Sequence, residues 1–263
     1  MADITQSNVD HGKPFDFGKT SDAYAKYRDI YPESFYAKLF ALGIGLPGQH
    51  ILDLGTGTGV LPRAMAPSGA HFTGIDISPE QIAQARALSQ GMEIDYLVSP
   101  AEEIDFAPGT FDAITAVQCF WYFNRAVLLP KLHEMLKEHG QLAILNMAWL
   151  PHKSKIARQS EQIILKYNPA WTGKGMRKLP FLPKPRWAGP LFRVSHRVLY
   201  CEGLSFTRES WHGRMLACRG IGASSLPPEQ IAAFEREHLA FLATLPEEFT
   251  VPHQIVMLIL QKN

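Results

Sequence analysis

A glycine-rich turn that could bind a ligand follows a short apolar run near residue 50. Residues 51–59 have the sequence ILDLGTGTG, in which Asp53 stands just before the glycines. Glycine permits positive φ and lets a ligand approach the backbone. A helix that begins after such a turn offers free N–H groups to an anionic or polar ligand. The segment therefore predicts a ligand-binding loop at the end of a strand.

A second carboxylate helps to decide which class of nucleotide-like ligand the loop would bind. Asp76 follows Gly57 by 19 residues, at the end of the next apolar run, where a carboxylate can accept hydrogen bonds from ribose hydroxyls. A dinucleotide loop requires Gly-x-Gly-x-x-Gly/Ala, but Val60 occupies the third small position. Asp53 would repel a pyrophosphate and could hold the α-amino group of a zwitterion. The favoured ligand is a nucleoside joined to an amino acid.

Aromatic residues after two expected strands form a candidate acceptor site. Residues 120–123 are Phe-Trp-Tyr-Phe, and Trp149 follows a later apolar run. Ligands of open α/β sheets bind outside the carboxyl ends of the strands. We therefore expect Trp121, Tyr122 and Trp149 to line an acceptor pocket, with Tyr122 also a candidate catalytic residue. Plain core packing is the alternative.

Residues 210–219 carry further polar candidates. His212 has an ordinary pKa near neutrality and is a candidate catalytic base. Arg214 and Arg219 are suited to bidentate contacts with a substrate carboxylate or phosphate. A packed histidine and solvated arginines are the alternatives. No His or Cys spacing typical of a metal site occurs, so no metal is expected, and Cys119 is expected to be a buried small apolar residue.

Alternating strand and helix patterns must position these groups. Short apolar runs predict strands at residues 50–54, 72–77, 94–98, 111–117 and 141–147, with helices at 60–67, 78–90 and 125–138. Further on, helices are expected at residues 153–167, 207–218 and 228–244, strands at 193–200 and 253–261, and a proline-rich loop at 168–192. Such alternation favours a mostly parallel sheet with helices on both faces.

These motifs together resemble the class I S-adenosylmethionine-dependent methyltransferases of type 11/25, which include ubiquinone/menaquinone-biosynthesis and trans-aconitate methyltransferase groups. The resemblance covers roughly residues 15–263. Its motifs are the segments LDLGTGTG at 52–59, GIDIS at 74–78, AE at 101–102 and FDAITAV at 111–117. It implies an α/β, Rossmann-like, seven-stranded sheet with an antiparallel last strand. It also implies a lid segment at residues 1–31 and a domain at 32–263 with helical lid insertions at about 150–192 and 205–247.

The same resemblance implies roles for individual residues around S-adenosylmethionine. The residues expected to hold its methionine part and its ribose are Asp53, Gly55, Thr56, Gly57 and Asp76. Ile77, Ala101 and Glu102 would surround the adenine, and Gln118 would reach the methionine end. Tyr24 and Arg28 resemble part of the family's N-terminal helix, which covers the cofactor. An ordinary packed amphipathic helix is the alternative for that last pair.

Composition places limits on where the protein works. The 263 residues are 46% hydrophobic and 19% charged, a mix typical of a globular protein. Three cysteines give no disulfide framework and favour a reducing compartment. The polar N-terminus lacks the apolar core of a signal peptide, and no apolar run could span a membrane. We expect a cytoplasmic monomer or homodimer.

The charge distribution leaves a second class of substrate open. Residues 151–200 contain eleven Lys and Arg and one Glu, a net charge of +10, whereas the rest of the chain carries −9. This basic segment also holds aromatic residues, a composition that can bind RNA through phosphate contacts and stacking. A solvated cap over a small-molecule pocket is the other interpretation.

Taken together, the sequence predicts methyl transfer from S-adenosylmethionine to a small anionic or aromatic metabolite, with S-adenosylhomocysteine as product. The alternatives are an RNA methyltransferase, a nicotinamide-dependent oxidoreductase and a non-catalytic binding module. Val60 and Asp53 disfavour the oxidoreductase. The intact glycine motif disfavours a module that has lost catalysis.

Overall fold

The computed structural model describes residues 4–6, 9–28, 30–175 and 185–263. The chain divides into two compact units. We call one the sheet unit, which consists of Tyr31–Met147, Leu179–Tyr200 and Ile255–Asn263. We call the other the helical unit, which consists of Met1–Ile30, Ala148–Lys178 and Cys201–Gln254.

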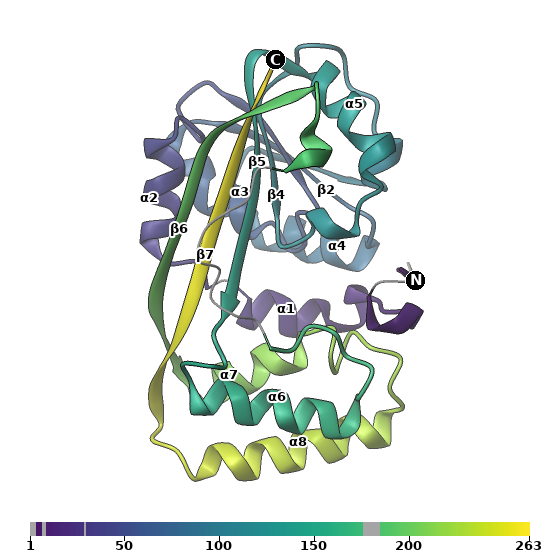
Figure 1. Ribbon diagram of the computed structural model, residues 1–263, viewed down its shortest axis with the longest axis vertical. Coiled ribbons are helices and arrows are strands. Elements are labelled where there is room, and N and C mark those ends of the chain that lie inside the picture. Colours follow the sequence, from purple (N-terminus) through teal and green to yellow (C-terminus); the bar gives the residue numbers. More distant parts are fainter. Residues whose placement is uncertain (1–3, 7–8, 29, 176–184) are drawn as a thin grey trace. The chain divides into compact units, whose positions relative to one another are not determined.

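The described residues form one seven-stranded sheet (Figure 1). Its strands are β1 (His50–Leu54), β2 (His71–Asp76), β3 (Ile94–Val98), β4 (Phe111–Val117), β5 (Leu136–Trp149), β6 (Phe192–Thr207) and β7 (Glu248–Lys262). Their order is β3-β2-β1-β4-β5-β7-β6. The pairs among β1 to β5 are parallel, whereas β7 runs antiparallel to both its neighbours. This confirms the α/β sheet expected from the sequence.

The helices divide between the units. The sheet unit contains α2 (Glu33–Ala41), α3 (Val60–Met65), α4 (Pro79–Leu88) and α5 (Arg125–Met135). The helical unit contains α1 (Ser21–Tyr27), α6 (Lys155–Tyr167), α7 (Arg208–Leu216) and α8 (Pro228–Ala243). Short 3₁₀ helices are η1 (Asp10–Gly12), η2 (Phe17–Thr20), η3 (Ala66–Ser68), η4 (Ala101–Glu103), η5 (Phe120–Tyr122) and η6 (Arg186–Ala188).

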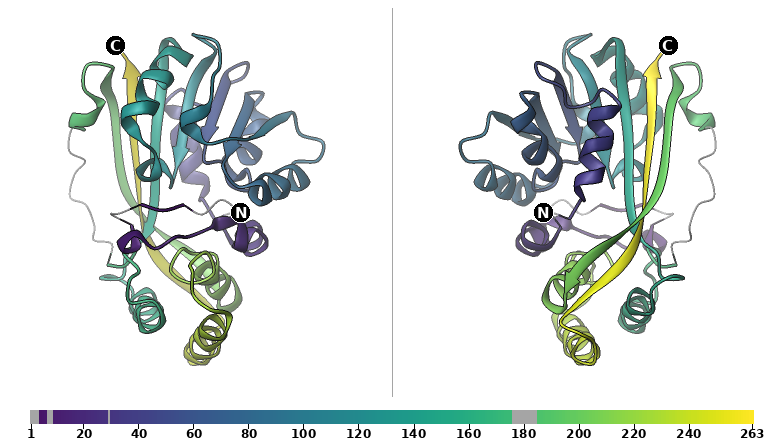
Figure 2. Two further views of the ribbon diagram at one scale, coloured as in Figure 1. Left: turned by 90° about the vertical axis from the view of Figure 1, so that its right-hand side faces the viewer. Right: turned by 90° about the vertical axis from the view of Figure 1, so that its left-hand side faces the viewer.

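The core of the sheet unit lies where apolar helix faces meet the sheet. Leu128 and Leu132 of α5 are fully buried and belong to the same cluster as Ile114 of β4. Figure 2 shows α5 in front of the sheet in one view and α2 in front of it in the opposite view. Fully burying each such side chain contributes roughly 1.5–3 kcal/mol. The helix α4 begins as its sequence indicates, with the Ser78 side chain accepting from Gln81 N and Pro79 at the first turn.

Several boundaries differ from those expected. The helix predicted to reach residue 138 ends at Met135, because Leu136 instead pairs with Phe111 at the start of β5. The strands β5, β6 and β7 are longer than the segments predicted for them and pass from one unit into the other. Each of them borders another long strand in the sheet. Backbone pairing with a long neighbour lets a strand continue through residues that alternate only weakly between apolar and polar.

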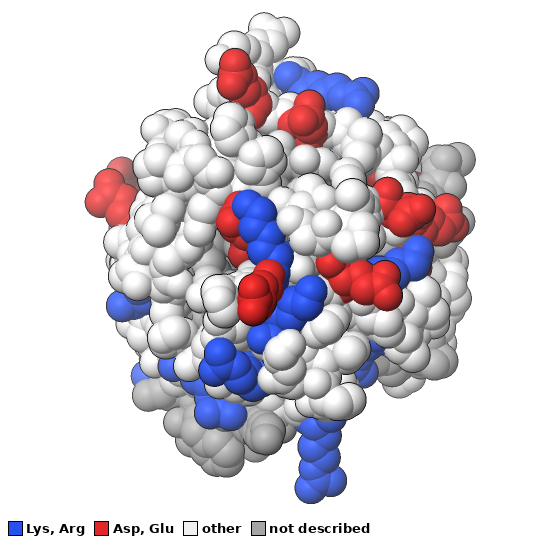
Figure 3. Space-filling model, turned by 90° about the horizontal axis from the view of Figure 1, so that it is seen from above, with Lys and Arg blue, Asp and Glu red and all other residues white. Residues whose placement is uncertain are grey.

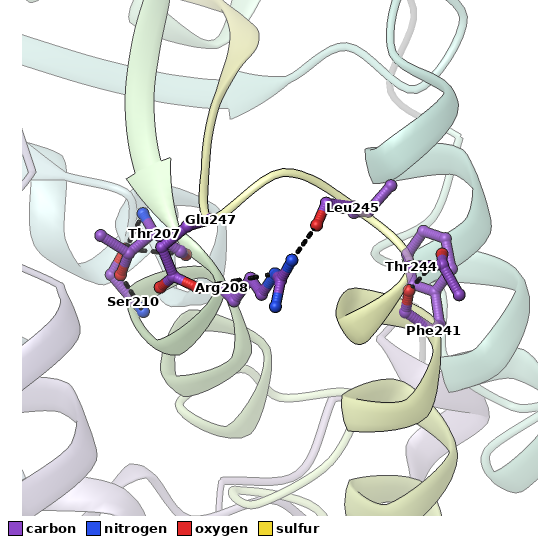
Figure 4. A network of polar contacts seen from close by, with 7 residues as sticks. All are labelled: Thr207, Arg208, Ser210, Phe241, Thr244, Leu245 and Glu247. Carbon is purple, nitrogen blue, oxygen red and sulfur yellow. Dashed lines mark hydrogen bonds and ion pairs between the residues drawn. The ribbon is translucent and has the colours of Figure 1, made fainter.

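Within the helical unit, α8 packs on α6 and α7, and α1 packs on α7. The junctions of α7 and α8 with the long strands are tied together (Figure 4). The Thr207 side chain caps α7 by accepting from Ser210 N. The Arg208 guanidinium donates to the carbonyl of Leu245, and its Nε lies 3.6 Å from Oε2 of Glu247. Within the described parts of the chain, no helix is long and apolar enough to cross a bilayer.

Candidate functional site

Asp53 is a buried carboxylate near the end of β1. Its side chain is 2% exposed, and its Oδ1 accepts a hydrogen bond of 2.6 Å from Thr115 Oγ1 on the neighbouring β4. Burial raises the pKa of Asp53 to about 6, although the hydrogen bond from Thr115 acts in the opposite direction. A carboxylate kept in such a place stabilises a positively charged group that binds beside it.

The glycine turn and the end of β2 are joined by the second predicted carboxylate. Asp76 Oδ2 accepts from the backbone N of Gly57 at 2.9 Å, and its Oδ1 accepts from Ser78 N at 2.9 Å. Thr56 N donates to the carbonyl of Ile75 at 2.8 Å. A carboxylate has about four acceptor positions, so Asp76 retains capacity for ligand hydroxyl groups. This hydrogen bond holds Asp76 against the turn, and its contact with a ribose stays a prediction.

The glycines of the turn are required for different reasons. Gly55 has φ +59, and a Cβ there would lie 2.9 Å from both Cβ and Sγ of Cys119. Gly59 has φ +73, and its missing Cβ leaves room for the hydroxyl of Tyr96. Cys119 Sγ donates to the carbonyl of Leu54 at 3.0 Å. Burial and the charges of nearby carboxylates raise the pKa of this thiol well above its usual range, so it packs as a neutral group.

Gln118 lies at the end of β4 with a backbone of positive φ, +64. Its N donates to the carbonyl of Leu145 and its Nε2 donates to the carbonyl of Met147 at 2.6 Å. Both partners are in β5. Residues other than glycine rarely adopt positive φ, and those that do cluster at functional sites. The contact of Gln118 with the methionine end of the cofactor, which the resemblance implies, stays a prediction.

The residues expected around an adenine ring also lie in the sheet unit. Ala101 is buried in η4, while Ile77, after β2, is 39% exposed. Glu102 Oε1 accepts a hydrogen bond of 2.6 Å from Asn124 N, which precedes α5. Glu102 therefore links η4 to the start of α5 in addition to any contact with a ligand.

Comparison with known proteins agrees with this geometry. Residues 52–144 match the family described as "Methyltransferase domain". The chain is 30% identical over 136 residues to the ubiquinone biosynthesis O-methyltransferase of Xanthomonas campestris pv. campestris, covering 50% of this chain and 57% of that protein. It is 32% identical over 132 residues to the protein of the same name from Pseudomonas aeruginosa, with 49% and 57% coverage. The chain thus spans little more than half the length of these relatives.

The fold is also similar to that of solved structures. A crystal structure of a putative methyltransferase from Bacillus halodurans C-125 superposes with a TM-score of 0.54 and 18% identity, covering 87% of this chain and 99% of that one. Residues 52–144 therefore match a methyltransferase domain, and the chain has the fold of that solved structure.

The aromatic residues predicted for the acceptor follow β4 in the sheet unit. Trp121 in η5 is 43% exposed, and its ring contacts Tyr122 edge-on with centroids 5.5 Å apart. Phe120 is buried and packs against Trp187 at 5.1 Å. The segment 120–123 therefore contributes to both the core and the surface, because Phe120 is buried and Trp121 is exposed.

The other predicted residues lie in the helical unit. Tyr24 and Arg28 are one turn apart on α1, and the Arg28 guanidinium lies 4.7 Å from the centroid of the Tyr24 ring. Tyr27, between them, packs on Gly213 of α7 and donates to Glu209 Oε1 at 2.8 Å. These contacts attach α1 to α7, so α1 is at least an ordinary packed helix. A cofactor contact of Tyr24 and Arg28 stays a prediction.

Arg219 has a protein partner where a substrate was expected. Its guanidinium forms an ion pair with Asp10, and the side chains are 13% and 6% exposed. The same carboxylate accepts from Thr172 N at 2.7 Å. Asp10 therefore joins the loop after α6 to Arg219. Arg219 thus has a protein partner, and its contact with a substrate stays a prediction.

Arg214 and Trp149, both predicted to contact the acceptor, lie side by side, and a substrate contact of either stays a prediction. Arg214 is 1% exposed, and its guanidinium lies 5.3 Å from the centroid of the Trp149 ring. Trp149 Nε1 donates to Oε1 of Glu161 at 2.8 Å. Burial raises the pKa of Glu161, with the Trp149 hydrogen bond opposing it. Sequence reasoning noted Glu161 only as the one acidic residue of the basic segment and not as a candidate site residue.

His212 is packed among aromatic rings. Its ring stacks on Phe234, with an interplanar angle of 10°, and its Nδ1 lies 2.9 Å from Nδ1 of His238. Burial lowers its pKa. His212 as a base stays a prediction. His238 and Thr115 were missed by sequence reasoning, and the one available signal was a polar threonine inside the apolar β4 run.

The basic segment does not fall in one unit. Lys153, Lys155, Arg158, Lys166 and Lys174 belong to the helical unit, whereas Arg186, Arg193 and Arg197 belong to the sheet unit. Arg177, Lys178 and Lys184 lie outside the described residues. Lys166 pairs with Glu237. On the face shown in Figure 3, Lys and Arg lie interspersed with Asp and Glu. No group of three or more metal-ligating side chains is found among the described residues.

Proposed function

We propose that this protein is an S-adenosylmethionine-dependent methyltransferase that acts on a small anionic or aromatic acceptor and releases S-adenosylhomocysteine. The observation that carries the proposal is the pair of carboxylates around the glycine turn. Asp53 lies in β1 and Asp76 ends β2, the strand beside it. Asp76 is already bonded to the turn through Gly57.

The residues present fit this cofactor. The Asp53 carboxylate would hold its α-amino group, and Asp76 would accept from its ribose hydroxyls. Gly55 lacks the Cβ that would crowd the turn, which favours close approach of a ligand. The exposed side chain of Ile77 would cover an apolar ring. A pyrophosphate is disfavoured because the buried carboxylate of Asp53 would repel it.

When bound, S-adenosylmethionine supplies a methyl group on a positively charged sulfur, already activated for displacement. The protein's part is then mainly to bind and align the two reactants. A base is needed when the acceptor must lose a proton of high pKa. Trp121, half exposed after β4, supplies an aromatic surface against which a flat acceptor would pack. Because the relatives are named O-methyltransferases, hydroxylated aromatic acids are the first acceptors to test.

Calorimetric titration with S-adenosylhomocysteine and with NADH tests the proposal. We expect binding of S-adenosylhomocysteine and none of NADH. Asp76→Asn should weaken that binding by about 10- to 100-fold, since hydrogen bonds to a charged group contribute roughly 1.5–3 kcal/mol. Asp95→Asn, in the exposed part of β3, is the matched control and should bind normally. Binding of NADH alone would overturn the proposal in favour of the oxidoreductase.

A further inference from the structure

Two histidines lie side by side in the sheet unit, where β1 and β2 begin. His50 is the first residue of β1 and His71 is the first residue of β2, and the two are direct partners in the parallel register. Paired residues on neighbouring strands project from the same face of a sheet. The two ring centroids are 5.1 Å apart, and both residues are exposed. The sheet thus presents two imidazoles together to solvent.

The nitrogen atoms of both rings are available to a ligand. Among the described residues, neither ring of the pair takes part in a hydrogen bond or an ion pair. The interplanar angle of 41° is also neither the parallel nor the perpendicular arrangement that aromatic pairs prefer. Imidazole nitrogen is the commonest protein ligand of transition metals. His50 and His71 can therefore supply one nitrogen each to such an ion.

The spacing of the two rings fits a single shared ion. A zinc ion lies about 2.0–2.1 Å from an imidazole nitrogen and hence roughly 3.2 Å from the ring centroid. Two rings at that distance whose centroids are 5.1 Å apart subtend roughly 105° at the metal, close to the tetrahedral angle that zinc adopts. The pair therefore needs little rearrangement to chelate one ion.

The charges beside the pair favour a cation over an anion. On one side, Asp112 of β4 accepts a hydrogen bond from the backbone N of His50, and its charge is paired with Lys137. On the other side, Glu93 lines the same hollow as His71. Glu93 makes no ion pair with the described residues, so its negative charge is left to attract a metal ion and to repel an anion such as phosphate.

We infer that His50 and His71 together bind one divalent transition-metal ion, each through a ring nitrogen, with water completing the coordination. No third metal-ligating side chain of the described residues joins them, so the site is simpler than a structural zinc site. Sequence spacing could not indicate it, because the two histidines meet only through the register of β1 and β2. The inference is independent of the proposed function, since the glycine turn follows the opposite end of β1.

Calorimetric titration with Zn²⁺ at pH 7.5 measures the site. We expect binding of one ion per chain, and His50→Gln or His71→Gln should weaken it about 100-fold, because a second ligand held in place raises avidity by roughly 10²–10⁴. The double variant should bind little more weakly than either single variant, since one substitution already removes the chelate. His196→Gln, which replaces an exposed histidine of the same unit, is the matched control and should bind normally.

Spectra of protein labelled with ¹⁵N-histidine identify the ligands directly. Zn²⁺ should shift ring nitrogens of His50 and His71 together, at the same metal concentration, and leave those of His196 unchanged. Separate saturation of the two rings, no shift of either, or equal effects of all three single substitutions on Zn²⁺ binding would overturn the inference. Thermal melting verifies that the variants fold, and calorimetry with S-adenosylhomocysteine tests the proposed function separately.

Discussion

At the scale of single residues, the charge of Asp53 suits the proposed binding of a cofactor but lowers the stability of the fold. Its pKa in the folded protein, about 6, lies above the ordinary value of 3.8. The folded state therefore binds the proton more tightly, and this carboxylate lowers stability as pH rises from about 4 to about 6. Such a cost is expected where a charge is kept for binding rather than for folding.

Replacing Asp53 tests this conflict. Asp53→Asn should raise the free energy of unfolding at pH 7 by ~1–3 kcal/mol, because the buried charge is gone. The same variant should bind S-adenosylhomocysteine about 10- to 100-fold more weakly. Urea unfolding and calorimetry measure the two effects. A variant that is both less stable and equally able to bind would refute the role assigned to Asp53.

The pH dependence of binding gives a separate check on the same carboxylate. In the unaltered protein, affinity for S-adenosylhomocysteine should fall by about tenfold from pH 7 to pH 5, as Asp53 becomes protonated. Asp53→Asn should show a flat profile over that range. Equal slopes in both proteins would assign the titration to another group.

Gly55 offers a steric test of the turn. Gly55→Ala should destabilise the protein by ~2 kcal/mol, since the new Cβ would meet Cys119 at positive φ. Adding Cys119→Ala removes Sγ but keeps the contact with Cβ, so it should recover only part of the steric cost, which adds to a conformational cost of about 1 kcal/mol. Gly109→Ala, at φ +68 with open space around it, is the matched control for that cost. Chemical denaturation measures all of these variants.

The residue scale also shows what sequence reasoning can reach. Asp53, Gly57 and Asp76 could be singled out because they lie on two successive strands and the turn between them, and their contacts with a cofactor stay predictions. The partner of Arg219 could not, because Asp10 is more than two hundred positions away. An arginine with an unknown distant partner is indistinguishable in sequence from one that waits for a substrate.

At the scale of elements, the attachment of α1 to α7 depends on one glycine. A Cβ at Gly213 would lie 2.1 Å from the Tyr27 ring. Gly213→Ala should detach α1, which hydrogen exchange would show as loss of protection over residues 21–27 with little change in α8. Tyr27→Ala should produce the same local pattern. Retained protection of α1 in both variants would contradict this account of the packing.

Some element boundaries depend on neighbouring residues in the sequence, and others depend on contacts with distant ones. The capped start of α4 was predictable from Ser78 and Pro79. The full length of β6 was not predictable, because residues 201–207 alternate only weakly between apolar and polar. Its Gly203 approaches Thr250 of β7 so closely that a Cβ would lie 2.7 Å from the methyl group. That contact exists only once β7 is beside it.

At the scale of the whole molecule, acid should weaken folding through the buried histidines. The pKa of His238 in the folded state, about 3, lies below its ordinary value of 6.5. The unfolded chain therefore binds protons first, and stability falls as pH drops below about 6.5. From this residue alone the loss should reach ~2 kcal/mol at pH 5.

Urea unfolding at pH 7.5 and pH 5 checks this expectation. His238→Gln should lose about 2 kcal/mol less than the unaltered protein between the two conditions. His152→Gln, which replaces an exposed histidine, should behave like the unaltered protein. Identical losses in all three would show that His238 does not control the acid response.

The division of the chain into two units was harder to foresee than the sheet. The strand–helix alternation up to residue 147 indicates the mostly parallel part of the sheet directly. The helical unit is assembled from three separated stretches of chain, and each is too short to indicate a unit by itself. The basic segment likewise suggested one surface, whereas its described residues divide between both units.

The central claim is methyl transfer to a small molecule. The most direct measurement incubates the purified protein and a fractionated cell extract with S-adenosylmethionine labelled in its methyl group. We predict label in acid-soluble metabolites, and about 10- to 100-fold less of it with Asp53→Asn at S-adenosylmethionine concentrations well below saturation. Label in RNA, or transfer unaffected by that substitution, would contradict the account.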